Sequence, residues 1–139
     1  MTAPVPRQTR QKQAVQDAFA TAGRPLSPQE VVTLAQVAVP SLGIATAYRT
    51  IKDLVKSGWL VSVATPAGNR FELADIEHHH HFFCRMCSRT FDIPGCAKDI
   101  ERMSPRGFVP EGHDVTIIGK CDLCARPKAK ARKEASVRA

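Results

Sequence analysis

The sequence lacks a long apolar run: nowhere in its 139 residues do apolar side chains continue for the roughly 18 residues that a membrane span needs. Its first ten residues also lack the apolar stretch and small-residue cleavage site of a secretory signal. These absences argue against a membrane or secreted protein and predict a cytoplasmic chain. In that reducing compartment, the five cysteines are expected to bind metal or carry redox chemistry rather than form disulfides.

The chain is also short, and its charge is unevenly spread. It could form one ordinary domain or two small ones, and two small cores would need additional crosslinks. Residues 1–75 carry eight Lys/Arg against five Asp/Glu, residues 76–126 carry seven of each, and residues 127–139 carry five against one. The basic first segment is compatible with a polyanionic partner, although a solvated basic surface explains the charge equally well.

The first 75 residues contain three short segments with helical periodicity. The first is expected to begin at Thr9 as N-cap and to end at Gly23. The second begins at Ser27, and Glu30 three residues later completes a capping box. The third covers Ala45–Lys56 and ends before a Ser-Gly pair.

The period then changes to that of β-strands. Residues 59–63 and 70–73 flank a turn-rich segment, which predicts a hairpin. Three helices followed by a hairpin form a winged helix, in which the third helix enters the major groove of DNA. A three-helix core with an incidental hairpin is the alternative interpretation.

The rest of the chain predicts a small α+β domain over residues 76–126. Its expected elements are three strands and one short helix, at residues 78–83, 90–93, 115–118 and 97–103 respectively. Because these few elements bury little surface, this domain is expected to need metal and a partner chain. Residues 127–139 have no apolar periodicity and are expected to form a disordered basic tail.

Two Cys-x-x-Cys pairs provide the strongest chemical signal. Each pair has the spacing at which two thiols bind one tetrahedral ion, and together they predict a structural zinc site made by Cys84, Cys87, Cys121 and Cys124. Such a closed shell leaves no position for reactive water, and zinc binding would supply folding free energy. A thiol oxidoreductase that uses the first pair is the rival interpretation, and it leaves the second pair unexplained.

Four consecutive histidines precede the first pair. On an extended strand, His79 and His81 share one face, while His78 and His80 share the other. Imidazole binds Zn(II), Fe(II) and Mn(II), so two further metal sites are possible. The candidate partners are Glu72, Glu77, Asp92, Asp99, Glu101 and His113. A solvated polar strand and a zinc hydrolase are the alternatives.

These motifs together resemble the ferric uptake regulator family of metal-dependent transcriptional regulators. The resemblance covers residues 9–124 and rests on residues 44–49 and 71–73, the histidine run and both cysteine pairs, in that order and spacing. It implies a homodimeric repressor, not an enzyme, that binds an A·T-rich palindromic operator when its regulatory metal is bound. By the same resemblance, Tyr48 contacts a thymine, Arg49 a phosphate, and Arg10 the DNA backbone.

The resemblance also implies two metal sites besides the structural zinc. A regulatory site that links the two halves is formed by Glu72, His79, His81 and Asp92. A further site is formed by His78, His80, His113 and a carboxylate of the predicted helix, for which Asp99 and Glu101 are rivals and Glu101 is the residue assigned. The regulatory ion is Zn(II) or Fe(II), with Mn(II) and a peroxide-sensing role as alternatives.

Two residues depart from the family pattern. Many iron sensors supply a histidine from the loop before the second helix, where this chain has Pro25, which has no ligating side-chain atom. Cys96 lies outside both pairs. It could be a small core residue, an oxidation sensor, or a soft ligand that favours zinc.

Overall fold

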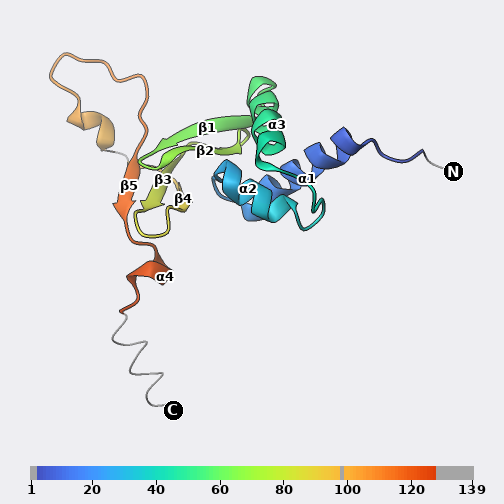
Figure 1. Cartoon of the computed structure of the whole chain (residues 1–139). Coiled ribbons are helices and arrows are strands. Elements are labelled where there is room, and N and C mark those ends of the chain that lie inside the picture. Colours follow the sequence, from blue (N-terminus) through green and yellow to red (C-terminus); the bar gives the residue numbers. More distant parts are fainter. Residues whose placement is uncertain (1–2, 98, 128–139) are drawn as a thin grey trace, which may run out of the picture.

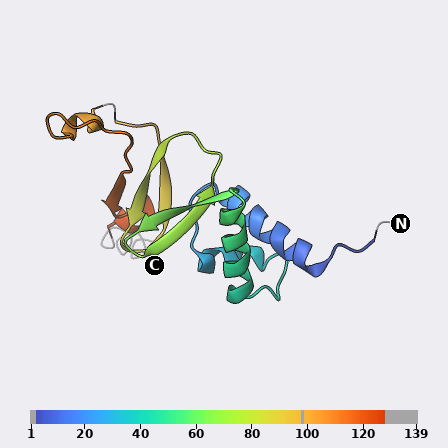
Figure 2. The same ribbon diagram turned by 90° about the horizontal axis from the view of Figure 1, so that it is seen from above.

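The structure, a computed structural model, describes residues 3–97 and 99–127. Its elements are α1 (Arg7–Ala22), α2 (Pro28–Ala35), α3 (Ile44–Lys56), β1 (Leu60–Thr65), β2 (Gly68–Leu73), β3 (His79–Cys84), β4 (Thr90–Pro94), the 3-10 helix η1 (Ile100–Met103), β5 (Thr116–Gly119) and α4 (Asp122–Ala125). The three long helices group on one side of the molecule, and β5 lies on the opposite side (Figures 1 and 2). This order confirms the predicted α+β class, with three helices and a hairpin followed by a smaller α/β half.

The observed helix starts show which capping residues correctly predicted a boundary. Ser27 caps α2: its hydroxyl accepts a hydrogen bond from the Glu30 amide, and the Glu30 carboxylate accepts one from the Ser27 amide. The predicted capping box is therefore confirmed. The prediction of Thr9 as N-cap of the first helix is wrong, because α1 already begins at Arg7, preceded by Pro6.

The hydrophobic core belongs to the helical half. Twelve buried apolar residues between Ala14 and Leu60 form one cluster, to which α1, α2, α3 and the start of β1 contribute. Trp59 packs edge-on against Phe19, with ring centroids 6.5 Å apart. Burial of this apolar surface is the main source of stability for the first half.

The hairpin is fastened to the loop before α2. Strands β1 and β2 are antiparallel, with Leu60 opposite Leu73 and Thr65 opposite Gly68. The Phe71 backbone in β2 also pairs with that of Leu26, through two hydrogen bonds of 2.9 Å. The loop before α2 is therefore held against the strand that carries Glu72.

The second sheet has the order β4-β3-β5, with β4 antiparallel and β5 parallel to the central strand. Few of its side chains are buried, and Ile117 and Ile118 on the edge strand are 50% and 57% exposed. The predicted helix over residues 97–103 is shorter than expected: the 3-10 helix η1 covers only Ile100–Met103. Residues 128–139 of the predicted tail lie outside the described residues.

Within the part of the chain that the structure describes, no helix is both long and apolar enough to span a bilayer.

Candidate metal centres

Four thiols converge where β3 ends and α4 begins. The thiol cluster consists of Cys84, Cys87, Cys121 and Cys124, whose sulfur atoms all lie within 4.8 Å of one another. The sulfur atoms of Cys87 and Cys121 are 3.9 Å apart. A zinc tetrahedron with bonds of about 2.3 Å has edges of about 3.8 Å, so this spacing fits zinc. The two pairs, 33 residues apart in sequence, therefore meet in one site, as their spacing predicts.

The local backbone explains how the thiol cluster forms. The chain turns back after Cys84, whose carbonyl accepts a hydrogen bond from the Ser88 amide at 2.8 Å, and Ser88 has a φ of 61°. The Cys121 amide donates to the sulfur of Cys84 at 3.3 Å. The first pair thus lies in a tight turn and the second at the start of α4, and the sulfur atoms of both pairs face a common centre.

Two thiols of the cluster, Cys84 and Cys124, differ widely in pKa. Burial raises the pKa of Cys84, but hydrogen bonds from backbone amides outweigh burial and lower the pKa to about 6. Its hydrogen bond to Cys121, together with burial and the neighbouring thiols, raises the pKa of Cys124 to about 12. Four thiolates cannot form side by side without a positive charge between them, and a divalent ion supplies that charge.

The hinge cluster joins the hairpin to the second sheet. It consists of Glu72 of β2, His79 and His81 of β3, and Asp92 of β4, and the register places Asp92 opposite His81. The Nε2 atoms of His79 and His81 lie 2.8 and 2.9 Å from Oε1 of Glu72, and 3.3 and 3.4 Å from Oδ1 of Asp92. The structure thus brings together all four residues that the family resemblance assigns to the regulatory site.

The hydrogen-bonding state of His79 fits a metal ligand. Its Nδ1–H donates to the Glu77 carbonyl oxygen at 2.7 Å, so a neutral ring presents a lone pair at Nε2. That lone pair faces the Glu72 carboxylate, which is 3% exposed. Two electron-rich groups face each other here unless the ring takes up a proton or a cation lies between them. A backbone carbonyl on the outer nitrogen is the usual support for a ligating histidine.

The carboxylates of the hinge cluster are similarly short of positive charge. Burial, together with the nearby Glu72 carboxylate, raises the pKa of Asp92 to about 6. The Oε2 atom of Glu72 is buried and has no hydrogen-bond partner among residues 3–97 and 99–127. Burial lowers the pKa of His81, which favours the neutral, ligating form of that ring. A divalent cation would satisfy all of these groups at once.

An arginine occupies the loop before α2, next to Pro25. Arg24 pairs with Glu30 of α2, donates to the Thr90 carbonyl at 3.5 Å and lies 5.7 Å from the centroid of the Phe91 ring. This loop therefore contacts β4 through Arg24, next to a proline that cannot ligate. No sequence signal distinguished Arg24 from other surface arginines.

The opposite face of β3 carries the imidazole–thiol cluster. It consists of His78, His80, Cys96 and His113, with one ligand atom of each within 4.8 Å of the others. The predicted alternation of the histidine run is therefore observed, since His79 and His81 belong to the hinge cluster. Glu101, the carboxylate assigned to this site from the resemblance, is not among the four. Its Oε1 lies 3.6 Å from Nδ1 of His113, on the outer side of that ring.

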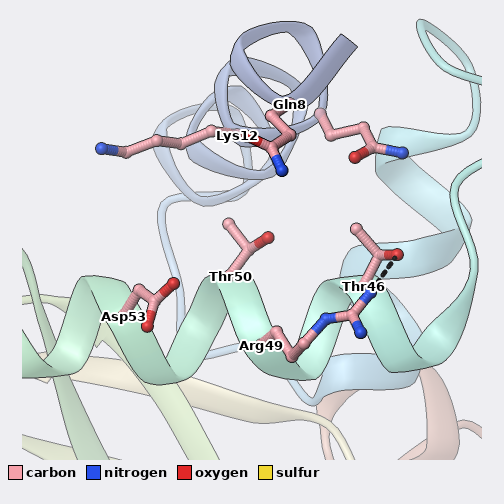
Figure 3. Close-up of a pocket in the computed structure, with 7 residues that line it drawn as sticks. Gln8, Lys12, Thr46, Arg49, Thr50 and Asp53 are labelled. Carbon is pink, nitrogen blue, oxygen red and sulfur yellow. Dashed lines mark hydrogen bonds between the residues drawn. The ribbon is translucent and has the colours of Figure 1, made fainter.

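The residues assigned to DNA contact lie on exposed faces of α1 and α3. Tyr48 is 49% exposed, and Arg49 and Arg10 are also exposed. A polar groove of about 600 Å³ separates the two helices and is lined by Gln8, Gln11, Lys12, Thr46, Arg49, Thr50 and Asp53 (Figure 3). Arg49 donates to the hydroxyl of Thr46 at 3.3 Å, which holds its guanidinium beside the groove.

Comparison with known proteins gives a consistent assignment. The model of the ferric uptake regulator family matches residues 6–118. The ferric uptake regulation protein of Campylobacter jejuni is 32% identical over 114 residues, which cover 76% of this chain and 71% of that protein. The zinc uptake regulation protein of Mycobacterium tuberculosis is 28% identical over 128 residues, which cover 89% of this chain and 98% of that protein.

Solved structures share the fold at lower sequence identity. The ferric uptake regulator of Helicobacter pylori, described as having three functional metal-binding sites, superposes with a TM-score of 0.68 at 23% identity, covering 86% of this chain and 82% of its own. The ferric uptake regulator of Francisella tularensis, solved with iron, superposes with a TM-score of 0.67 at 21% identity, covering 91% of this chain and 97% of its own.

Proposed function

Because the chain belongs to the ferric uptake regulator family, we propose that it is a metal-responsive repressor that binds a palindromic DNA operator as a homodimer when the hinge cluster holds a divalent ion. Residues 1–75 would bind DNA and residues 76–126 would form the dimer, in the cytoplasm. The four residues of the thiol cluster would hold a structural Zn(II). The relatives that match include iron and zinc uptake regulators, so both ions are candidates for the hinge.

The observation that carries this proposal is the position of the hinge cluster. Glu72 belongs to the hairpin of the helical half, whereas His79, His81 and Asp92 belong to the second sheet. An ion held by all four would fix the orientation of one half relative to the other. Binding energy that favours one orientation shifts the population towards it, which makes the ion a switch.

The proposed DNA-binding face is centred on α3. Tyr48 and Arg49 project from the helix that a winged-helix protein inserts into the major groove, where Tyr48 would contact a base and Arg49 a phosphate. Arg10 on α1 would add a second backbone contact. The groove between α1 and α3 has lysine, arginine and glutamine side chains along its edges, which suits contacts with phosphate oxygens (Figure 3).

The dimer is supported by the edge of the second sheet. β5 lies at the end of the order β4-β3-β5, and its Ile117 and Ile118 side chains are half exposed. Apolar side chains on an edge strand favour association with another chain. A second copy would also bring a second α3, as a palindromic operator requires.

The experiment is a metal titration of operator binding by the intact protein. A duplex is first selected from a randomised library by the Zn(II)-loaded protein. Protein that retains zinc only in the thiol cluster is then titrated with Zn(II), with Mn(II) or, without oxygen, with Fe(II). Binding to the duplex is followed by fluorescence anisotropy at fixed salt. We expect at least one ion to raise the affinity by about 5- to 150-fold, the usual range of allosteric coupling, with two chains bound per duplex. An affinity that none of the three ions changes would refute the proposal.

A matched pair of variants tests the DNA-binding face. Arg10→Ala removes one predicted phosphate contact, whereas Arg106→Ala removes the same charge from an exposed position in the second half. We expect the first change to lower the slope of log affinity against log salt by about 1, and the second to leave it unchanged. Equal slopes for the two variants would remove Arg10 from the interface.

A further inference from the structure

The imidazole–thiol cluster departs from the ligand set that the family resemblance implies. We propose that the further metal site, which the resemblance places at His78, His80 and His113, takes the Cys96 thiolate and not a carboxylate as its fourth ligand, and that this third metal centre therefore selects Zn(II) over Fe(II) and Mn(II). Its existence and selectivity do not depend on the proposed DNA-binding function.

The distances suit one tetrahedral ion. The Nε2 atom of His113 lies 3.2 Å from that of His78 and 3.2 Å from that of His80. A tetrahedron with zinc–nitrogen bonds of about 2.0–2.1 Å has edges of about 3.3 Å, so His113 already stands at the spacing of zinc ligands from both other imidazoles. The Cys96 sulfur lies 3.2 Å from Nε2 of His80 and 2.9 Å from Nε2 of His113. These two contacts would lengthen by a few tenths of an ångström when zinc binds between them.

The fourth ligand is the cysteine and not the carboxylate. The Cys96 sulfur stands on the Nε2 side of His113, where the other imidazoles converge. The Glu101 carboxylate lies 3.6 Å from Nδ1, on the opposite side of the same ring. Within residues 3–97 and 99–127, Nδ1 of His113 is buried and has no hydrogen-bond partner, and the Glu101 carboxylate is the acid group that faces it. If the carboxylate moved into hydrogen-bond range, it would hold the proton on this outer nitrogen and leave Nε2 free to ligate, as in carboxylate–histidine–zinc arrangements. We therefore expect Glu101 to act as a positioning residue for His113.

The His80 ring must change its tautomer when a metal binds at the third centre. The Val115 amide donates to its Nδ1 at 3.3 Å, which places the proton of the neutral ring on Nε2. Binding a metal at Nε2 moves that proton to Nδ1 and breaks the contact with Val115. The ring is buried, and burial together with the neighbouring histidines lowers its pKa, which favours the neutral form. For the neutral ring, the change is a shift of the proton from Nε2 to Nδ1.

The ligand types set the preference for zinc. A thiolate is a soft ligand that suits Zn(II), whereas carboxylates also suit harder ions such as Mn(II). The hinge cluster has two carboxylates and no sulfur, so the two faces of β3 would differ in selectivity. In Figure 1, η1 and the segment that follows it stand apart from the sheet before the chain returns to β5. A filled third centre would tie Cys96 and His113, on either side of η1, to β3. Zinc there would thus order the start of β5, an effect on dimerisation that rests on the proposed function.

Cobalt(II) provides the test, because a thiolate ligand gives it a near-ultraviolet charge-transfer band. The full-length protein is prepared with zinc in the thiol cluster only, and Co(II) is titrated while released zinc is measured. The hinge cluster contains no sulfur, so Co(II) bound there should not absorb in this band. We expect parent protein and Asp92→Asn, which disables the hinge cluster, to develop the band without zinc release. Cys96→Ser should bind Co(II) without it.

Zinc competition titrations then separate the two rival ligands. Cys96→Ser should lower the Zn(II) affinity of this centre by at least about 100-fold, more than loss of an outer-shell partner usually costs. Glu101→Gln should lower it by about 10-fold and keep the cobalt band. The proposal is overturned if the parent shows no band, if Cys96→Ser keeps both band and affinity, or if Glu101→Gln alone loses the ion. Operator binding is measured separately, so failure here leaves the proposed function standing.

Discussion

The charge balance of the hinge cluster makes a strong prediction about the metal-free protein. Glu72 and Asp92 share this site, and the pKa of Asp92 is raised from its ordinary 3.8 to about 6. Because the folded-state value lies above the unfolded one, the folded protein binds the proton more tightly. The resulting stability is fully present below about pH 4 and is lost as the pH rises through about 6. Asp92→Asn should therefore stabilise the metal-free protein at pH 7.5.

The magnitude follows from the size of the pKa shift. Two pKa units correspond to about 3 kcal/mol, at roughly 1.36 kcal/mol per unit. The Asp92 side chain is 22% exposed and partly screened, so we expect a gain of about 1–2 kcal/mol. The exposed Asp75 is the matched control, and its change to Asn should alter stability by less than about 0.5 kcal/mol.

The assay is urea unfolding followed by circular dichroism, with zinc retained in the thiol cluster. With Zn(II) at about 100 times its dissociation constant at the hinge, the parent protein should gain about 2.7 kcal/mol from the hinge cluster and overtake the variant, which lacks that gain. The order of stability thus reverses when the ion is added. If metal-free Asp92→Asn is less stable than the metal-free parent at pH 7.5, the argument from unbalanced carboxylates is wrong.

Three further predictions concern the other parts of the molecule. Tyr48→Ala should weaken operator binding by about 1–3 kcal/mol in a salt-controlled gel shift while zinc content stays unchanged, and equal binding would remove Tyr48 from the interface. Cys124→Ser should lose the structural zinc and the dimer, because zinc binding would supply folding free energy that the small second half lacks. Elemental analysis with gel filtration checks this, and a zinc-free dimer would contradict it. Ser27→Ala should lower the free energy of unfolding by about 1 kcal/mol through loss of the α2 cap, and a denaturation curve identical to the parent's would show that the cap contributes nothing.

Features that depend on neighbouring residues could be read from the sequence. The capping box at Ser27 and Glu30 spans three residues, and the alternation of the histidine run follows from strand geometry. Each Cys-x-x-Cys pair is likewise a local signal. The meeting of the two pairs is a long-range event, but it could be predicted because a four-ligand shell needs both.

Features that depend on tertiary contacts could not be predicted. Which residue completes the third site depends on how the chain folds between β4 and β5, where η1 is a single 3-10 turn and places Glu101 on the outer side of His113. The contact of Arg24 with β4 similarly joins residues that are 66 positions apart. The early start of α1 at Arg7 shows that a good capping residue such as Thr9 does not fix a boundary when the preceding residues also form a helix.

The central claim is that an ion held between the two halves of the chain controls DNA binding, and one measurement tests it most directly. Operator affinity is determined for the parent protein and for Glu72→Gln, both with zinc in the thiol cluster, across the same series of buffered free Zn(II) concentrations. The hairpin contributes only Glu72 to the hinge cluster, so the account predicts that the parent's affinity rises with zinc and that the variant's stays at the metal-free level. A variant whose affinity rises with zinc as the parent's does would contradict the account.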